Sequence, residues 1–70
     1  MRLIKIGELI AEIPDETEDV FDVDFGGHYL LQITKYDGCR YEVTNGVDGY
    51  GNNCCAEFKH AAVQIFKEQD

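Results

Sequence analysis

Hydrophobic and polar residues alternate most regularly in the middle of the chain, on both sides of the glycine pair at positions 26 and 27. Side chains of a β-strand point alternately to the two faces of a sheet, so the pattern predicts two strands that each have one apolar face. A three-residue loop over positions 26–28 brings the apolar residues of both strands into register. The predicted pairs are Phe25 with Tyr29, Val23 with Leu31, and Phe21 with Ile33.

A third strand is predicted over Cys39–Thr44. It follows the middle strand, Tyr29–Thr34, after a three-residue loop over positions 36–38 that has Gly38 in the left-handed conformation. This loop length sets apolar residues of the two strands opposite one another, whereas a two-residue turn would set them opposite polar residues. The sequence therefore predicts a three-stranded antiparallel meander with one buried face. The predicted pairs are Ile33 with Tyr41 and Leu31 with Val43.

Apolar residues at helical spacing flank this meander on both sides. Leu3–Ile13 has one apolar stripe, and Pro14 would end a helix at that point. An alternative interpretation of residues 3–6 is a short edge strand. Cys54–Gln69 has a second stripe, with Asn52 or Asn53 available as a cap. Two helices covering the apolar face of the meander make a two-layer α+β fold, and 70 residues are enough for one such domain, over residues 1–70.

Composition adds a strong charge asymmetry to this picture. The chain has 14 acidic and 6 basic residues, a formal net charge of −8. Such acidity opposes direct binding to nucleic acid or to an anionic membrane, and it favours a basic partner. The alternative is that the acidity only keeps a small protein soluble. Eight acids lie between Glu8 and Asp24, and no Lys or Arg occurs from Ile6 to Thr34.

Six of these acids form the predicted partner-binding surface. Two of them, at positions 22 and 24, share one face of a predicted strand about 6.7 Å apart. That distance resembles the spacing of successive phosphates on a nucleic-acid strand, and the connector over positions 15–19 continues the row. We expect the surface to occupy a nucleic-acid channel, lined by Lys and Arg, on another protein; a solvated face with a polar loop is the alternative. The predicted contact residues are Asp15, Glu16, Glu18, Asp19, Asp22 and Asp24.

The glycine-rich segment over positions 45–53 does not match a nucleotide-binding motif. It lacks the Gly-Lys-Ser/Thr sequence of a P-loop, and a calcium loop would need a glutamate where Lys59 stands. The segment is expected to be a flexible connection with a turn at Asn45-Gly46. Tyr50, between two of the glycines, is expected either to cover the edge of the core or to be exposed as a contact residue.

Cysteine and histidine residues supply the remaining candidate chemistry. None of them has the spacing of a zinc site, and no third group is identifiable that would orient a cysteine–histidine pair for catalysis. Cys54 could have a lowered thiol pKa at a helix N-terminus, or it could simply be buried. We therefore predict a protein that is not an enzyme and that uses no metal and no cofactor.

The three cysteines also bear on the compartment. Cys39, Cys54 and Cys55 are an odd count with a vicinal pair, and the sequence shows no signal peptide and no long apolar run. This usage predicts a reducing compartment, the cytoplasm. The sequence leaves open whether Cys39 approaches either of the other two.

The size, the predicted helix–meander–helix order and the acid block from Glu8 to Asp24 resemble the small acidic inhibitors encoded by phages and mobile elements, above all anti-CRISPR proteins. The resemblance covers the whole chain in outline and includes no motif, so it transfers no site residue. It implies direct binding to a CRISPR effector complex in the host cytoplasm, blocking DNA entry or nuclease recruitment without catalysis. Effector complexes hold nucleic acid in positively charged channels, which agrees with the charge argument.

Two other hypotheses follow from the residues. One is a small cytosolic protein–protein interaction module, without nucleic-acid mimicry, that pairs through apolar contacts such as Leu30 and Tyr36 and forms a homodimer in its simplest version. The other is an enzyme or metal protein that uses Cys54, Cys55 and a histidine.

Overall fold

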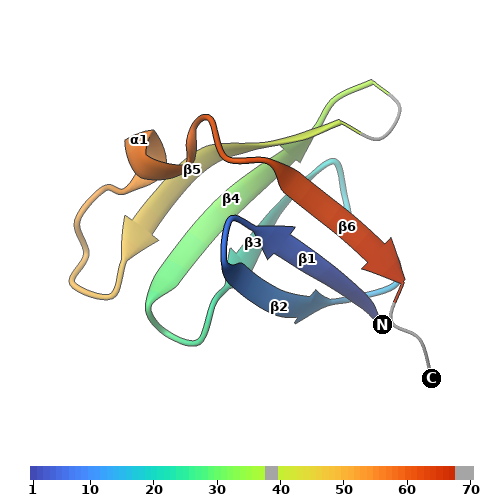
Figure 1. Cartoon of the computed structure of the whole chain (residues 1–70), viewed down its shortest axis with the longest axis horizontal. Coiled ribbons are helices and arrows are strands. Elements are labelled where there is room, and N and C mark those ends of the chain that lie inside the picture. Colours follow the sequence, from blue (N-terminus) through green and yellow to red (C-terminus); the bar gives the residue numbers. More distant parts are fainter. Residues whose placement is uncertain (38–39, 68–70) are drawn as a thin grey trace.

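The structure is a computed structural model that describes residues 1–37 and 40–67. These residues form two three-stranded antiparallel sheets, with strand orders β2-β1-β6 and β3-β4-β5, and one short helix (Figure 1). The predicted α+β fold with two helices is therefore wrong, and the protein is mostly β. The elements are β1 (Arg2–Ile6), β2 (Leu9–Ile13), β3 (Val20–Asp24), β4 (Tyr29–Lys35), β5 (Tyr41–Asp48), α1 (Cys55–Phe58) and β6 (Val63–Lys67).

The predicted N-terminal helix over Leu3–Ile13 is a β-hairpin. β1 pairs with β2 around a two-residue turn, so that Ile6 lies opposite Leu9. Gly7 occupies the first turn position with a φ of 60°, which is where type II′ hairpin turns place glycine. The alternative interpretation of residues 3–6 as a strand is correct, but β1 is the central strand of its sheet rather than an edge.

Apolar residues on both faces of this hairpin produced the helical spacing. Ile4 and Ile6 alternate as strand residues do, and both are fully buried. Leu3 and Ile10 lie on the other face, and Ile10 is 57% exposed. Because these outward residues are apolar as well, a period of two could be mistaken for a period near 3.6.

The predicted C-terminal helix over Cys54–Gln69 is also wrong. Of residues 54–67, only the four of α1 are helical, and β6 then pairs with β1 from Val63 opposite Ile6 to Lys67 opposite Arg2. Gln69 lies outside the described residues. The predicted cap at Asn52 or Asn53 is not formed, because Cys54 occupies the N-cap position and makes no side-chain cap hydrogen bond. Asn53 lies one residue earlier, and its Oδ1 accepts a hydrogen bond of 3.0 Å from the Cys55 N–H. The inward apolar residues of α1 and of β6 together produced the spacing that resembled one helical stripe.

The predicted pairing of the first two meander strands is confirmed. β4 is the middle strand of its sheet, Val23 lies opposite Leu31, and Phe21 lies opposite Ile33. At the end of the pair, the Phe25 N–H donates a 2.8 Å hydrogen bond to the carbonyl of Tyr29.

The predicted pairing of β4 with the third strand is wrong. Lys35 lies opposite Tyr41 and Ile33 opposite Val43, two residues from the predicted register. A β-bulge between Gln32 and Ile33 shifts the register once more, so that Leu31 lies opposite Gly46. The strand begins at residue 41 and continues to residue 48, so Asn45-Gly46 is part of β5 and not a turn. The predicted loop residue Gly38 and strand residue Cys39 lie outside the described residues.

The core lies between the two sheets, which face each other in Figure 1. A second sheet, and not a pair of helices, covers the apolar face of the meander. Within the described residues no helix is long and apolar enough to cross a membrane. The buried core residues are Ile4, Ile6, Ile13, Val23, Phe25, Leu31, Ile33, Val43 and Cys54.

Candidate acidic interaction surface

The six predicted contact residues lie on the connector between β2 and β3 and on β3 itself. All six side chains are exposed. On β3 the alternation is as predicted: Val23 is only 4% exposed and faces the core, while Asp22 and Asp24 face outward. The two carboxylates therefore share the outer face of the β3-β4-β5 sheet.

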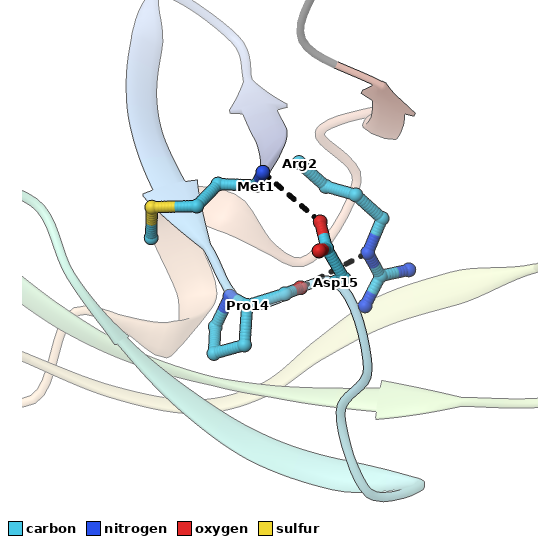
Figure 2. A network of polar contacts seen from close by, with 4 residues as sticks. All are labelled: Met1, Arg2, Pro14 and Asp15. Carbon is cyan, nitrogen blue, oxygen red and sulfur yellow. Dashed lines mark hydrogen bonds and ion pairs between the residues drawn. The ribbon is translucent and has the colours of Figure 1, made fainter.

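The first part of the connector is fixed to the N-terminus of the chain. The Met1 amino nitrogen lies 3.0 Å from Oδ1 of Asp15, and Nε of Arg2 donates a 3.1 Å hydrogen bond to the Pro14 carbonyl (Figure 2). The Arg2 guanidinium also donates to the Thr17 hydroxyl at 3.2 Å. The hydrogen bond and the charge of the amino terminus hold the pKa of the Asp15 carboxyl below its usual range. Asp15 is thus neutralised within the molecule, although no basic residue lies near it in sequence.

The last residue of the connector also lies near basic side chains. Asp19 lines an open pocket of about 460 Å³ together with Lys35, Tyr36, Asp37 and Arg40. Its carbonyl accepts a 2.7 Å hydrogen bond from the Lys35 N–H, and the Arg40 guanidinium lies 5.1 Å from the centre of the Tyr36 ring. The fold therefore places cations at both ends of the acidic connector.

Five of the six carboxylates make no ion pair within 4.0 Å in the part of the chain that the structure describes. The ion pairs within 4.0 Å there are Met1 with Asp15, and Arg40 with Glu42. Asp24 has a structural role in addition, because its Oδ1 accepts a 2.7 Å hydrogen bond from the Gly27 N–H and so holds the β3–β4 loop. Of these five, Asp19 shares its pocket with Lys35 and Arg40, and the four that lie outside that pocket are Glu16, Glu18, Asp22 and Asp24.

An exposed apolar pair lies beside these carboxylates on the outer face of the sheet. Leu30, opposite Asp24 on β4, is 46% exposed, and Val47, opposite Leu30 on β5, is 37% exposed. Sequence reasoning missed Val47 because it depends on the bulge in β5. It named Tyr36 as the apolar neighbour of Leu30, but the two residues lie at opposite ends of β4. A shallow pocket of about 290 Å³ between the two kinds of side chain is lined by Asp22, Leu30, Gln32, Asn45, Gly46 and Val47.

Cys54 does not have the environment of a reactive thiol. Cys54 is 2% exposed, and its burial raises the pKa of the thiol, with Glu57 and Asp48 acting in the same direction. The interpretation of Cys54 as a buried residue is the correct one. Cys39 is outside the described residues. Among residues 1–37 and 40–67, no group of three or more His, Cys, Asp or Glu side chains could hold a metal ion.

The glycine-rich connection after β5 has a fixed backbone and an exposed aromatic ring. Oδ1 of Asp48 accepts hydrogen bonds from the N–H groups of Tyr50 and Asn52, at 2.8 and 2.9 Å. These bonds hold the pKa of Asp48 below its usual range, the one from Asn52 having the larger effect. Tyr50 is 93% exposed, so of the two interpretations the structure supports the exposed contact residue.

Comparison of the chain with protein-family models, with curated proteins and with solved structures finds no match. Its function is therefore argued from its own side chains.

Proposed function

We propose that this protein is a non-enzymatic inhibitor that binds a basic, nucleic-acid-binding surface of a larger complex. The observation that carries the proposal is the group of unpaired carboxylates, Glu16, Glu18, Asp22 and Asp24, along the connector and the edge strand β3. Each would face a Lys or Arg of the partner. By occupying that surface, the protein would exclude nucleic acid or prevent nuclease recruitment, the mode expected of an anti-CRISPR protein.

The neighbouring apolar pair, Leu30 and Val47, adds binding free energy that the charged residues alone do not provide. Exposed ion pairs contribute only about 0.2–1 kcal/mol each, because water and salt screen them. Burying apolar side chains such as Leu30 and Val47 adds roughly 25 cal/mol for each Å² removed from water. The carboxylates would then determine the specificity for the partner and the association rate, and the apolar pair would slow dissociation.

The arrangement of the thiols weighs against the enzyme hypothesis. A cysteine nucleophile needs the thiolate form and access to substrate. Cys54 is buried with a raised pKa, and Cys55 is half-buried, with its thiol 3.9 Å from the carbonyl of Val43.

Two matched triple variants test the proposal. Replacing Glu16, Glu18 and Asp22 by Lys changes the net charge from −8 to −2, and so does replacing Glu8, Glu12 and Glu57, which lie elsewhere on the surface. Only the first variant should lose affinity for the basic partner, by about tenfold or more, since three pairs of about 0.5 kcal/mol together approach 1.4 kcal/mol. Equal losses of affinity in both variants would show that only the net charge matters. No loss of affinity in either variant would contradict the proposal.

A second candidate function is a homodimeric interaction module. The exposure of Leu30 and Val47 on adjacent strands favours it, because these side chains could pack against a second copy. Light scattering at 1 to 100 μM tests it. A dimer that Leu30→Asp dissociates would support this function, and a monomer throughout the range would remove it.

A further inference from the structure

A second open pocket lies where three connections meet, away from the apolar pair of the outer face. It measures about 610 Å³, within the range of ligand-binding clefts. The connection between β5 and α1 runs beside the β3–β4 loop there (Figure 1), and a Cβ added at Gly49 would lie 3.0 Å from the carbonyl oxygen of Gly27. The lining residues are Leu9, Gly27, His28, Tyr29, Asp48, Gly49 and Tyr50.

The pocket combines two tyrosine rings and the imidazole of His28 with one carboxylate. The Tyr29 ring is half-buried and held edge-on against Phe58, with ring centres 5.2 Å apart. The Tyr50 ring is almost fully exposed, yet its backbone is fixed, because the Tyr50 N–H is bonded to Asp48 and the Gly51 N–H donates to the Asp48 carbonyl at 3.1 Å. A large apolar ring is thus presented to solvent by a rigid turn.

The charge of the pocket selects a cationic occupant. Asp48 is its acidic residue, and neither Lys nor Arg is among the described residues that line it. The N–H groups of Tyr50 and Asn52 both bond to Oδ1 of Asp48, and the Asn52 side chain and the Gly51 N–H also favour the charged carboxylate. A cation is attracted both to a carboxylate and to the faces of aromatic rings. Of the two cationic side chains, arginine fits better, because its flat guanidinium stacks on rings and its N–H groups can reach a carboxylate at the same time.

The geometry points to a binding site for one arginine side chain of the basic partner, with its guanidinium between Tyr50 and Asp48 and its methylene stem against Tyr29 and Leu9. The inference rests on the proposed function for the source of the arginine. The pocket itself needs no partner to be tested. Its side chains are also different from the carboxylates of the connector and β3, so the two proposals can fail separately.

The test is a ¹H–¹⁵N NMR titration of the full chain with N-acetyl-arginine-N′-methylamide. We expect saturable shifts at the amides of Gly27, His28, Tyr50 and Gly51. The matching citrulline amide, which has the same shape without the charge, should give none. Tyr50→Ala and Asp48→Asn should each weaken binding about fivefold or more, the second while keeping an oxygen for the two N–H groups of the turn. Tyr36→Ala, which removes an exposed tyrosine at the other end of β4, should leave binding unchanged.

Several results would overturn the inference. These are the absence of saturable shifts with arginine, equal binding of citrulline, and saturable shifts confined to β3 and the connector. A lysine amide that binds as tightly as the arginine amide would overturn the assignment to guanidinium. None of these results would affect the comparison of the two triple variants, since that comparison changes no residue of the pocket.

Discussion

Replacing Gly46 by Ala tests the bulged pairing on which the outer face of the β3-β4-β5 sheet depends. A Cβ at this position would lie 2.6 Å from Cδ2 of Leu31 and 3.4 Å from Sγ of Cys54. Leu31 is fully buried between the sheets, so its methyl group has no free space to enter. The backbone at Gly46 does not have a positive φ, and the effect of the substitution therefore comes from packing.

The expected loss in the free energy of unfolding of Gly46→Ala is the difference between two opposing contributions. Inserting one methyl group into a filled core costs about 1–3 kcal/mol. Removing a glycine reduces the entropy of the unfolded chain and returns about 0.4–1 kcal/mol. The net destabilisation of Gly46→Ala then lies between about 0 and 2.6 kcal/mol, with its centre at about 1.3 kcal/mol. A 70-residue domain has a total stability of roughly 3.5–10 kcal/mol, so the loss is measurable and leaves the protein folded.

Urea denaturation of four proteins measures the effect: the original chain, Gly46→Ala, Leu31→Val and the double variant. Leu31→Val opens space in the core, so the double variant should lose less stability than the sum of the two single changes. An interaction energy of about 0.5 kcal/mol or more is expected for residues in contact. If Gly46→Ala stabilises the protein, or if the two changes are additive, then residue 46 does not pack against Leu31 and the register of β5 is different.

Three further predictions concern side chains of the two candidate surfaces. Asp24→Ala should cost about 1 kcal/mol in urea denaturation, because it removes the hydrogen bond to Gly27, whereas Asp22→Ala should change stability by less than about 0.5 kcal/mol; equal losses would contradict the role of Asp24 in the loop. Tyr50→Ala should leave the melting temperature almost unchanged, since the ring is exposed, and a clear drop would show that it packs in solution. The pKa of Asp48 is lowered in the folded protein, so the unfolded chain binds more protons in acid. The Asp48 carboxylate therefore contributes fully to the free energy of unfolding above pH 3.8, the usual pKa of an aspartate, and this contribution is lost as the pH falls below that value. Asp48→Asn should flatten the acid side of the curve of stability against pH, and an unchanged curve would contradict this.

The meander was the part of the fold that the sequence could predict. Its first two strands alternate strictly, and the glycine pair between them limits the loop to one length that aligns the apolar faces. The same reasoning predicted that Asp22 and Asp24 share the exposed face. Each of these conclusions depends only on neighbours in sequence and on the period of a strand.

The remaining elements could not be predicted in this way because their outward faces include apolar residues. Ile10 and Phe66 are 57% and 44% exposed, and they extend the apolar pattern of β2 and β6 beyond one residue in two. Pairing of β6 with β1 also joins the two ends of the chain, and no local pattern reports a contact over that separation. Tertiary pairing therefore decided between strand and helix.

Contacts between residues far apart in the sequence also make the acidic surface different from the predicted one. The sequence shows an acidic connector without a basic residue nearby. The fold brings the amino terminus to Asp15, and it places Asp19 in a pocket with Lys35 and Arg40. Five of the six predicted carboxylates make no ion pair within the described residues, and the apolar pair on the outer face depends on a bulge that sequence patterning does not reveal.

The most direct test of the central claim is competition between this protein and nucleic acid for a captured partner. The tagged chain is used to capture proteins from a cell lysate, and the bound complex is challenged with DNA or RNA at 50 and 300 mM salt. We expect nucleic acid to displace the protein and binding to weaken steeply at the higher salt. The Glu16, Glu18 and Asp22 triple variant should capture about tenfold less of the partner, while the matched control variant captures as much as the original chain. A partner that is retained at high salt, is not displaced by nucleic acid and binds the triple variant equally well would contradict the claim.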